Sequence, residues 1–414
     1  MANKTKFLAS LFNLSQDIIE NIPFEIIDEW IKSDQSLETA KRILEPTKVR
    51  GISVSSDSAG LSSISIEKEL IEVLGIISYP KEIIYGIGKS IGGQGIGIWA
   101  ADNTQMFFDE SIDPNKVVSA FLYLQEVALK KCEINIGFGL HFGEKYLIGG
   151  GLYGEEADFI EMIAEDNAKG GEVLISGQLW NLLDKNQFKM SPGEDINHPK
   201  DVVYRIDSGV LLRDVPINLD YNYPIPFSQE FFKDLRKFYS SKDKDLLDVL
   251  NGKYLQEKTI VLVERKKEKH HIEEISLLND IALYALMEQG SHDILKNYNG
   301  LEIKTVGSLG IYEFDYCDDA INFTLAFRES LKEEGVECKI GVADGSVIIF
   351  NLANGNKDIA GNPINIASKL AQDKGEFGKI YLTREVFEKL EKRYFEYENI
   401  EVNVSEIKIN AIKI

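Results

Sequence analysis

Cysteine is scarce in this chain of 414 residues, which contains only Cys132, Cys317 and Cys338. The three are far apart and odd in number, so they indicate neither a disulfide framework nor a zinc site, and a reducing compartment is expected. Basic residues are also few, because 46 lysines and arginines stand against 67 aspartates and glutamates, for a formal net charge of −21. Such an acidic chain repels phosphate backbones and anionic lipid, which excludes nucleic acid and membrane surfaces as expected partners.

Long hydrophobic runs are missing as well. No stretch of about 18 consecutive apolar residues occurs, so the sequence predicts no membrane insertion. The first residues, Met1–Leu14, are interrupted by Lys4, Lys6 and Asn13 and lack the apolar segment and cleavage site of a signal peptide. We therefore expect a cytoplasmic protein.

The chain is long enough for two or three domains, since 44% of its residues are hydrophobic. Apolar residues at helical spacing predict a helical lead-in over residues 1–47 that packs on the domain after it. Alternation then predicts a strand over Gly51–Asp57, followed by a turn of small residues and a helix. Further elements are expected in chain order: two strands around a tight glycine turn over Ile83–Trp99, a helix over Val117–Lys131, and strands over Glu133–Leu140 and Glu172–Ser176.

The second half of the chain repeats the pattern of the first. Four blocks recur in one order: Asp57, Lys89, Gly137 and Gly171 match Glu264, Lys304, Gly341 and Gly378, at offsets of 207, 215, 204 and 207 residues. We interpret this as a tandem duplication, with domains over 48–207 and 257–414 and a helical connector over 208–256. Two such copies usually pair through matching surfaces, which predicts an intramolecular pseudo-dimer with sites at the shared interface.

Two strings in the second copy are specific. One is Ile303-Lys304-Thr305-Val306-Gly307-Ser308, and the other carries Asp358, Gly361, Asn365, Ala367, Ser368 and Leu370 at fixed spacing. With the strand, aspartate and turn of the first copy, they resemble class III nucleotidyl cyclases. The second copy is most similar to the second cyclase half of mammalian membrane adenylate cyclases. The resemblance covers about three quarters of the chain and implies an α/β (α+β) fold of two ferredoxin-like cyclase domains, with N-terminal helices and a helical connector.

The resemblance also implies a metal and phosphate side in the first copy. Cyclisation of a nucleoside triphosphate uses two metal ions, and magnesium prefers carboxylate oxygens. Asp57 matches the first metal-binding aspartate, for Mg²⁺ or Mn²⁺. Ser58, Gly60, Ser62 and Ser63 match the turn whose backbone N–H groups hold the triphosphate.

The second copy, by the same resemblance, supplies the base and ribose side. Lys304 and Asp358 match the pair that reads adenine, and Asn365 matches the asparagine that orients the ribose. Lys369 stands where the family has an arginine for the developing phosphate charge, so the charge is kept but the bidentate fork is lost.

Other positions depart further from the family pattern. The second metal aspartate is expected at Gly93, which cannot ligate a cation through a side chain. The opposite, pseudo-symmetric site has Glu264 and Ser308 at its metal positions, and Asp158 and Met162 in place of the asparagine and arginine. Lys89 is the one familiar residue there. We expect that site to be empty or to hold a non-substrate ligand.

Three hypotheses of function follow. The first is a degenerate adenylate cyclase, a pseudoenzyme that binds ATP or a related nucleotide at the interdomain interface and acts as a signalling sensor, regulator or scaffold, with a protein partner possible. The second is a slow adenylate cyclase that makes cAMP from ATP. The third is a structural or assembly protein without nucleotide binding. Plain alternatives also hold for single residues, since Asp57 can cap a helix and Lys304 can be a solvated charge.

Overall fold

The computed structural model describes residues 23–97, 99, 103–197, 201–215, 227–267, 270–351, 357–404 and 407–414. The chain divides into two compact units. The first-copy unit is Leu44–Leu247. The second-copy unit joins Asp248–Ile414 to the N-terminal residues up to Ile43.

One mixed sheet forms the centre of the first-copy unit, in the strand order β2-β3-β1-β4-β6-β8-β7, with β5 paired to β4. Only β4 and β6 run parallel among the pairs of the described residues. The strands are β1 (Lys48–Ala59), β2 (Gln94–Gly95), β3 (Thr104–Asp109), β4 (Asn135–Ile148), β5 (Gly151–Tyr153), β6 (Val173–Ser176), β7 (Phe188–Asn197) and β8 (Val202–Gly209).

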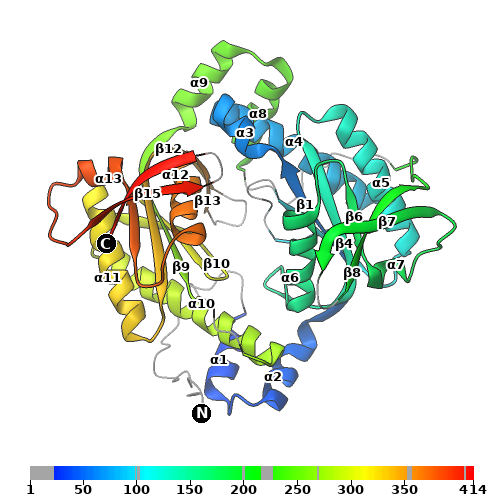
Figure 1. Cartoon of the computed structure of the whole chain (residues 1–414), viewed down its shortest axis with the longest axis horizontal. Coiled ribbons are helices and arrows are strands. Elements are labelled where there is room, and N and C mark those ends of the chain that lie inside the picture. Colours follow the sequence, from blue (N-terminus) through cyan, green and yellow to red (C-terminus); the bar gives the residue numbers. More distant parts are fainter. Residues whose placement is uncertain are drawn as a thin grey trace. The chain divides into compact units, whose positions relative to one another are not determined.

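Helices cover both faces of this sheet (Figure 1). On one face, Phe121 of a helix stacks edge-on against Phe108 and Phe138 of the strands. On the other face, Phe159 of a second helix contacts His141 of β4. The helices are η2 (Glu45–Thr47), α3 (Leu61–Glu67), α4 (Leu70–Ser90), α5 (Pro114–Lys131), α6 (Glu155–Glu161), the π-helical turn η3 (Met162–Asn167), α7 (Gly177–Trp180) and α8 (Gln229–Ser241).

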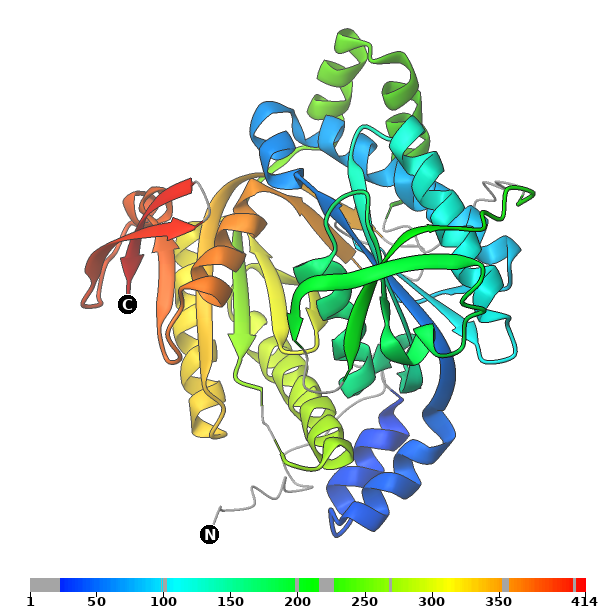
Figure 2. The ribbon, with the colours of Figure 1, turned by 45° about the vertical axis from the view of Figure 1, so that its right-hand side comes forward.

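The second-copy unit repeats this topology, in the order β10-β11-β9-β12-β14-β16-β15 with β13 paired to β12. Its strands are β9 (Gln256–Arg265), β10 (Gly300–Val306), β11 (Leu309–Phe314), β12 (Cys338–Asn351), β13 (Lys357–Gly361), β14 (Ile380–Thr383), β15 (Glu398–Val404) and β16 (Ile407–Lys413). Its helices after the connector are α10 (Glu273–Leu295), α11 (Cys317–Glu333), α12 (Asn362–Ser368), η4 (Lys369–Asp373) and α13 (Arg384–Lys389). The expected α/β fold of two domains is confirmed (Figure 2).

Glycine in the central strand lets α12 lie directly on the sheet. A Cβ atom added at Gly341 of β12 would lie 2.0 Å from the carbonyl oxygen of Ala367 in α12. The apolar cluster beneath the helix therefore forms at van der Waals distance, with Leu262, Ala343 and Val347 among its buried members.

The N-terminal helices α1 (Phe24–Lys32) and α2 (Leu37–Leu44) pack differently from the prediction. The lead-in was expected to pack on the domain that follows it, but α1 contacts α10 of the second copy. Trp30 is fully buried there and donates a hydrogen bond from Nε1 to Oδ1 of Asn279 at 3.0 Å. The remainder of the lead-in prediction, residues 1–22, lies outside the described residues.

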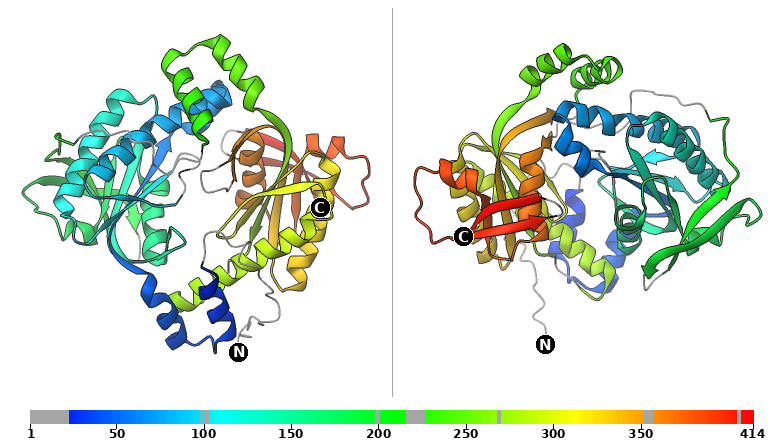
Figure 3. Two further views of the ribbon diagram at one scale, coloured as in Figure 1. Left: turned by 180° about the vertical axis from the view of Figure 1, so that it is seen from behind. Right: turned by 45° about the horizontal axis from the view of Figure 1, so that its top comes forward.

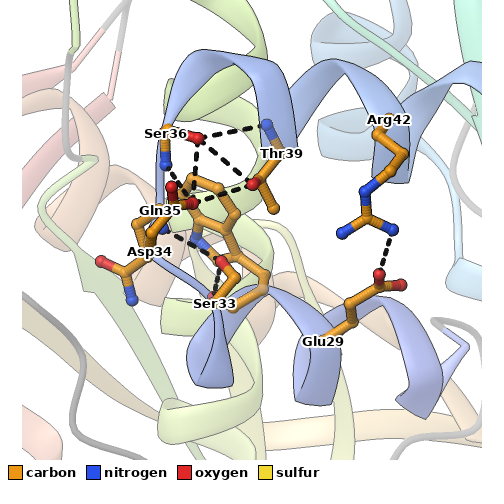
Figure 4. Close-up of polar contacts among 8 residues, drawn as sticks. Glu29, Ser33, Asp34, Gln35, Ser36, Thr39 and Arg42 are labelled. Atoms are coloured by element: carbon orange, nitrogen blue, oxygen red, sulfur yellow. Dashed lines mark hydrogen bonds and ion pairs between the residues drawn. The ribbon is translucent and has the colours of Figure 1, made fainter.

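A polar turn fixes the angle between α1 and α2 (Figure 4). The Oδ1 atom of Asp34 accepts hydrogen bonds from the backbone N–H of Ser36 at 3.1 Å and from the hydroxyl of Thr39 at 2.8 Å. Arg42 of α2 pairs with Glu29 of α1 across the turn. These contacts hold the pair as a helical hairpin.

The prediction of two strands over Ile83–Trp99 is wrong for the first half of this segment. Residues up to Ser90 continue helix α4, and strand β2 is limited to Gln94–Gly95. An apolar run with glycines does not distinguish a buried strand from a buried helix by periodicity, and α4 is buried over most of its length.

The connector also forms helices, α8 (Gln229–Ser241) and α9 (Lys244–Tyr254). Helix α8 packs on α4 within the first-copy unit. None of the helices in the described part of the chain is long and apolar enough to cross a membrane.

The contact at Gly341 gives a test of this packing. Gly341→Ala should lower the free energy of unfolding by about 1–3 kcal/mol, because the added methyl group overlaps the backbone of α12. Gly252→Ala in α9, where a Cβ atom meets nothing within 4 Å, should instead raise it by about 0.5–1 kcal/mol. Urea denaturation of both variants measures the difference, and equal effects would contradict the close contact.

Candidate functional site

Lys304 and Asp358 of the second copy form an ion pair. Lys304 lies on β10 and Asp358 on β13, and the Nζ–Oδ1 distance is 2.5 Å. Their neighbours Ile303 and Ile359 belong to one apolar cluster on the sheet, which holds the two strands together. Asp358 is 3% exposed, so the structure brings together the two residues that were predicted to read a base.

The pair presents a hydrogen-bond donor beside an acceptor. Oδ1 of Asp358 accepts from Lys304 and from the backbone N–H of Ile359 at 2.9 Å. Oδ2 accepts no hydrogen bond within the described residues. The Lys304 ammonium has further N–H groups to offer.

Asn365 and Lys369 lie on the adjoining helical segment. Asn365 is exposed on α12, and Lys369 is half-buried where α12 continues into η4. The backbone N–H of Lys369 bonds to the carbonyl groups of Asn365 and Ile366. No hydrogen bond links either side chain to Lys304 or Asp358 among the residues that the structure describes.

The metal and phosphate side of the first copy begins at Asp57. This residue is half-buried on β1, opposite Gly137 of β4. Ser58 is buried, and Gly60 takes a left-handed conformation with φ of 88° between the strand and α3. The predicted turn over Ser58–Ser63 is therefore shorter than expected, because Ser62 and Ser63 are already in the first turn of α3.

The structure places Gly93 outside the hairpin turn in which the second metal aspartate was expected. Gly93 follows the end of α4 and precedes β2, whereas the family places this aspartate in the hairpin turn between the two strands. The β2–β3 connection runs from 96 to 103, and positions 98 and 100–102 lie outside the described residues. The sequence has an aspartate there, Asp102.

Strand pairing also corrects the expected role of Lys89. That residue is exposed in the last turn of α4. The two sheets can be superimposed strand by strand, starting from Ser176 and Thr383, the N-caps of α7 and α13. Their strand pairing then places Ile96 at the position of Lys304 and Gly151 at the position of Asp358. The first copy therefore has no ion pair at these two positions.

In the second copy a lysine neutralises the counterpart of Asp57. That counterpart is Glu264, which stands opposite Lys339 as Asp57 stands opposite Gly137. The Nζ atom of Lys339 lies 2.9 Å from Oε2 of Glu264 and donates to the carbonyl group of Gln372 at 2.7 Å. An ammonium group thus lies beside this carboxylate and neutralises its charge, which makes it a poorer ligand for a metal ion.

A buried polar cluster in the first copy escaped the sequence analysis. His141 is fully buried on β4, and its Nε2 atom lies 2.5 Å from Oε2 of Glu156 in α6. Gly143 leaves room for this contact, since a Cβ atom there would lie 2.7 Å from the Glu156 oxygen. Burial lowers the pKa of His141, and Glu156 opposes this shift. Nε2 donates this hydrogen bond, because a carboxylate oxygen can only accept.

Lys145 lies two positions beyond Gly143 on the same face of β4. It is 1% exposed, and burial lowers its pKa from 10.5 to about 8 despite the nearby charge of Glu156. The second copy has Ala343 and Val347, both within its apolar cluster, at the positions equivalent to His141 and Lys145.

These observations define the fold of the two units. Two sheets of identical strand order, each with helices on both faces, form the class III cyclase fold twice in one chain. The resemblance found in the sequence is confirmed at the level of the fold.

Comparison with known proteins agrees with this assignment. No family model matches the sequence, and no curated protein is similar to it. A class III adenylyl cyclase-like ATP-binding protein from Pseudomonas aeruginosa matches 82% of this chain and 85% of its own, with a TM-score of 0.52 and 11% identity. The adenylyl cyclase CyaB from P. aeruginosa matches 38% of this chain and 93% of its own, with a TM-score of 0.33 and 17% identity. The guanylate cyclase domain of RhGC from Catenaria anguillulae matches 38% of this chain and 95% of its own, with a TM-score of 0.31 and 14% identity.

Lys145 makes stability depend on pH in a defined direction. The folded chain loses this proton near pH 8 and the unfolded chain near 10.5, so the free energy of unfolding gains a rising contribution between these values. Lys145→Met should remove that rise and stabilise the protein at pH 7 by about 1–4 kcal/mol, because each unit by which burial lowers the lysine pKa costs about 1.4 kcal/mol. Urea denaturation at pH 7, 8, 9 and 10 measures both effects. The exposed Lys408→Met should keep the pH profile of the parent, and a parental profile in Lys145→Met would refute the assignment.

Proposed function

We propose that the chain binds ATP or a related nucleotide, with the base on Lys304 and Asp358 of the second copy and the phosphates on the Asp57 side of the first. It acts as a sensor, regulator or scaffold rather than as an efficient enzyme. The ion pair between Lys304 and Asp358 is the observation that carries this proposal.

Adenine fits the hydrogen-bonding groups of this pair. Its edge presents an acceptor, N1, beside a donor, the N6 amino group, and the pair presents a donor beside an acceptor. Asp358 is held by the backbone N–H of Ile359 and by Lys304, so its position is fixed before a base arrives. Asn365, exposed one helical segment away, is the residue we assign to the ribose.

The phosphate side requires a cation, because a triphosphate and Asp57 are both anionic. Magnesium usually binds proteins through one or two carboxylates and completes its shell with phosphate oxygens and water. Asp57 fits this role as a carboxylate ligand, and the bound ion would neutralise phosphate charge. The N–H groups in the first turn of α3 have no partners within the helix and add donors for phosphate oxygens.

Weak turnover is supported by Lys369. A lysine at this position offers one point charge, whereas the arginine of the family offers a planar fork of donors to the transition state. The other set of positions has lost its matching groups, with Ile96 and Gly151 in the first copy and Lys339 paired with Glu264 in the second. One set of nucleotide groups therefore remains, and it lacks the arginine. The P. aeruginosa neighbour is described as an ATP-binding protein, which is consistent with binding as the retained property.

Calorimetric titration with a non-hydrolysable ATP analogue tests the proposal. We expect saturable binding that strengthens when Mg²⁺ or Mn²⁺ is present. Lys304→Gln should weaken it about 10- to 100-fold, the value of a hydrogen bond to a charged group. Lys296→Gln, which changes an exposed lysine of the same unit, should bind like the parent. An absence of binding with and without metal would refute the proposal and favour an assembly role.

A slow adenylate cyclase is the second candidate. It is favoured because Asp57 is kept and because Gly93 lies outside the β2–β3 hairpin turn, so the glycine there does not count as a lost metal ligand. This candidate predicts cAMP formation from ATP with Mn²⁺ that Asp57→Asn abolishes. Chromatography of the products detects cAMP at low turnover. Product formation that is equal in the parent and in Asp57→Asn would exclude this site as its source.

A further inference from the structure

A cavity lies between helix α4 and the connector helix α8, which pack together in the first-copy unit. Figure 3 shows α8, in green, beside α4, in blue. The cavity has a volume of about 310 Å³, which lies within the range of small-molecule sites. Apolar and aromatic side chains form one part of its wall: Tyr79 from α4, and Phe232, Leu235 and Tyr239 from α8.

Charged side chains form the other part of the wall. Glu82 is 5% exposed and pairs with Arg236 at 3.1 Å. Burial raises the pKa of Glu82 to about 6, and Arg236 opposes this shift. Lys131, at the end of α5, also lines the cavity and has no carboxylate partner among the described residues.

The aromatic faces in this wall already carry cations. The Nζ atom of Lys242 lies 3.9 Å from the centre of the Tyr239 ring, and the guanidinium carbon of Arg236 lies 5.4 Å from that of Phe232. A cationic ligand would compete with these groups and would meet Lys131. The cation at this cavity without a carboxylate partner among the described residues is the ammonium group of Lys131. The complementary ligand is therefore an anion.

We propose that this cavity binds a small amphipathic anion, an organic carboxylate or sulfonate with an apolar or aromatic body. Its acidic group pairs with Lys131, and its body lies against Tyr79, Phe232 and Tyr239. Such a ligand contacts α4 and α8 together and therefore stabilises the docking of the connector helix on the first copy. This site involves none of the residues assigned to the nucleotide.

The fluorescent probe 8-anilinonaphthalene-1-sulfonate tests the site on the full chain. We expect saturable binding of one probe molecule with an increase in fluorescence, and displacement of the probe by octanoate. Lys131→Glu should weaken binding about three- to tenfold, as expected for reversal of an exposed charge. The neighbouring Lys130→Glu is the matched control, because Lys130 pairs with Glu126 and does not line the cavity.

A second pair of measurements locates the probe. Ser240→Trp, at an exposed position on the cavity wall, should fill the space and abolish saturable binding while thermal unfolding stays cooperative. The uncharged probe N-phenyl-1-naphthylamine should bind equally well to the parent and to Lys131→Glu. Sulfonate binding that survives Ser240→Trp, or that responds equally to Lys130→Glu and Lys131→Glu, would overturn the proposal.

Discussion

The close backbone contact between the central strand and the helix above it is the constraint on which each sheet depends. Gly341 of β12 admits the backbone of α12 at Ala367, and Gly139 of β4 admits η3 at Ala164. Because the helix touches the strand backbone, the side chains on either side of the glycine decide whether the interior is apolar or charged. The same geometry carries the hairpin of β12 and β13, and with it Asp358, to the edge of the apolar cluster.

The two copies use this common frame in opposite ways. In the second copy the positions beside the glycine are apolar, and charge is concentrated in Lys304 and Asp358 at the edge. In the first copy the edge is apolar, with Ile96 buried, and polar and charged groups lie beneath the helix as His141, Glu156 and Lys145. Each copy thus carries one of the two paired sets, at different positions of a common fold.

Much of the fold could be predicted from the sequence, because its signals are local. Alternation predicts β1, and the resemblance to class III cyclases pairs Lys304 with Asp358 as base-reading residues, which the structure brings together. The continuation of α4 could not be predicted, since Ile83–Gly88 contains no charged residue that would mark a solvent-facing side. One signal was present, because the offset of 215 residues from Lys89 to Lys304 departs furthest from the other offsets. Strand pairing replaces Lys89 by Ile96, and it also aligns Gly341 with Gly139 rather than with the predicted Gly137. The cavity beside α8 depends on how the connector docks, which no local pattern contains.

The acidity of the chain sets the physical terms for both proposed ligands. A net charge of −21 opposes the approach of any anion, and salt screens this opposition beyond about 8 Å. Recognition of an anion by this protein must therefore come from groups at short range, where screening is weak. Lys304 beside a buried carboxylate, the metal ion that we propose on Asp57 and the ammonium group of Lys131 are such groups. Added salt should consequently reduce the long-range repulsion while leaving these contacts in place, unlike in a basic protein, where salt weakens the binding of anions.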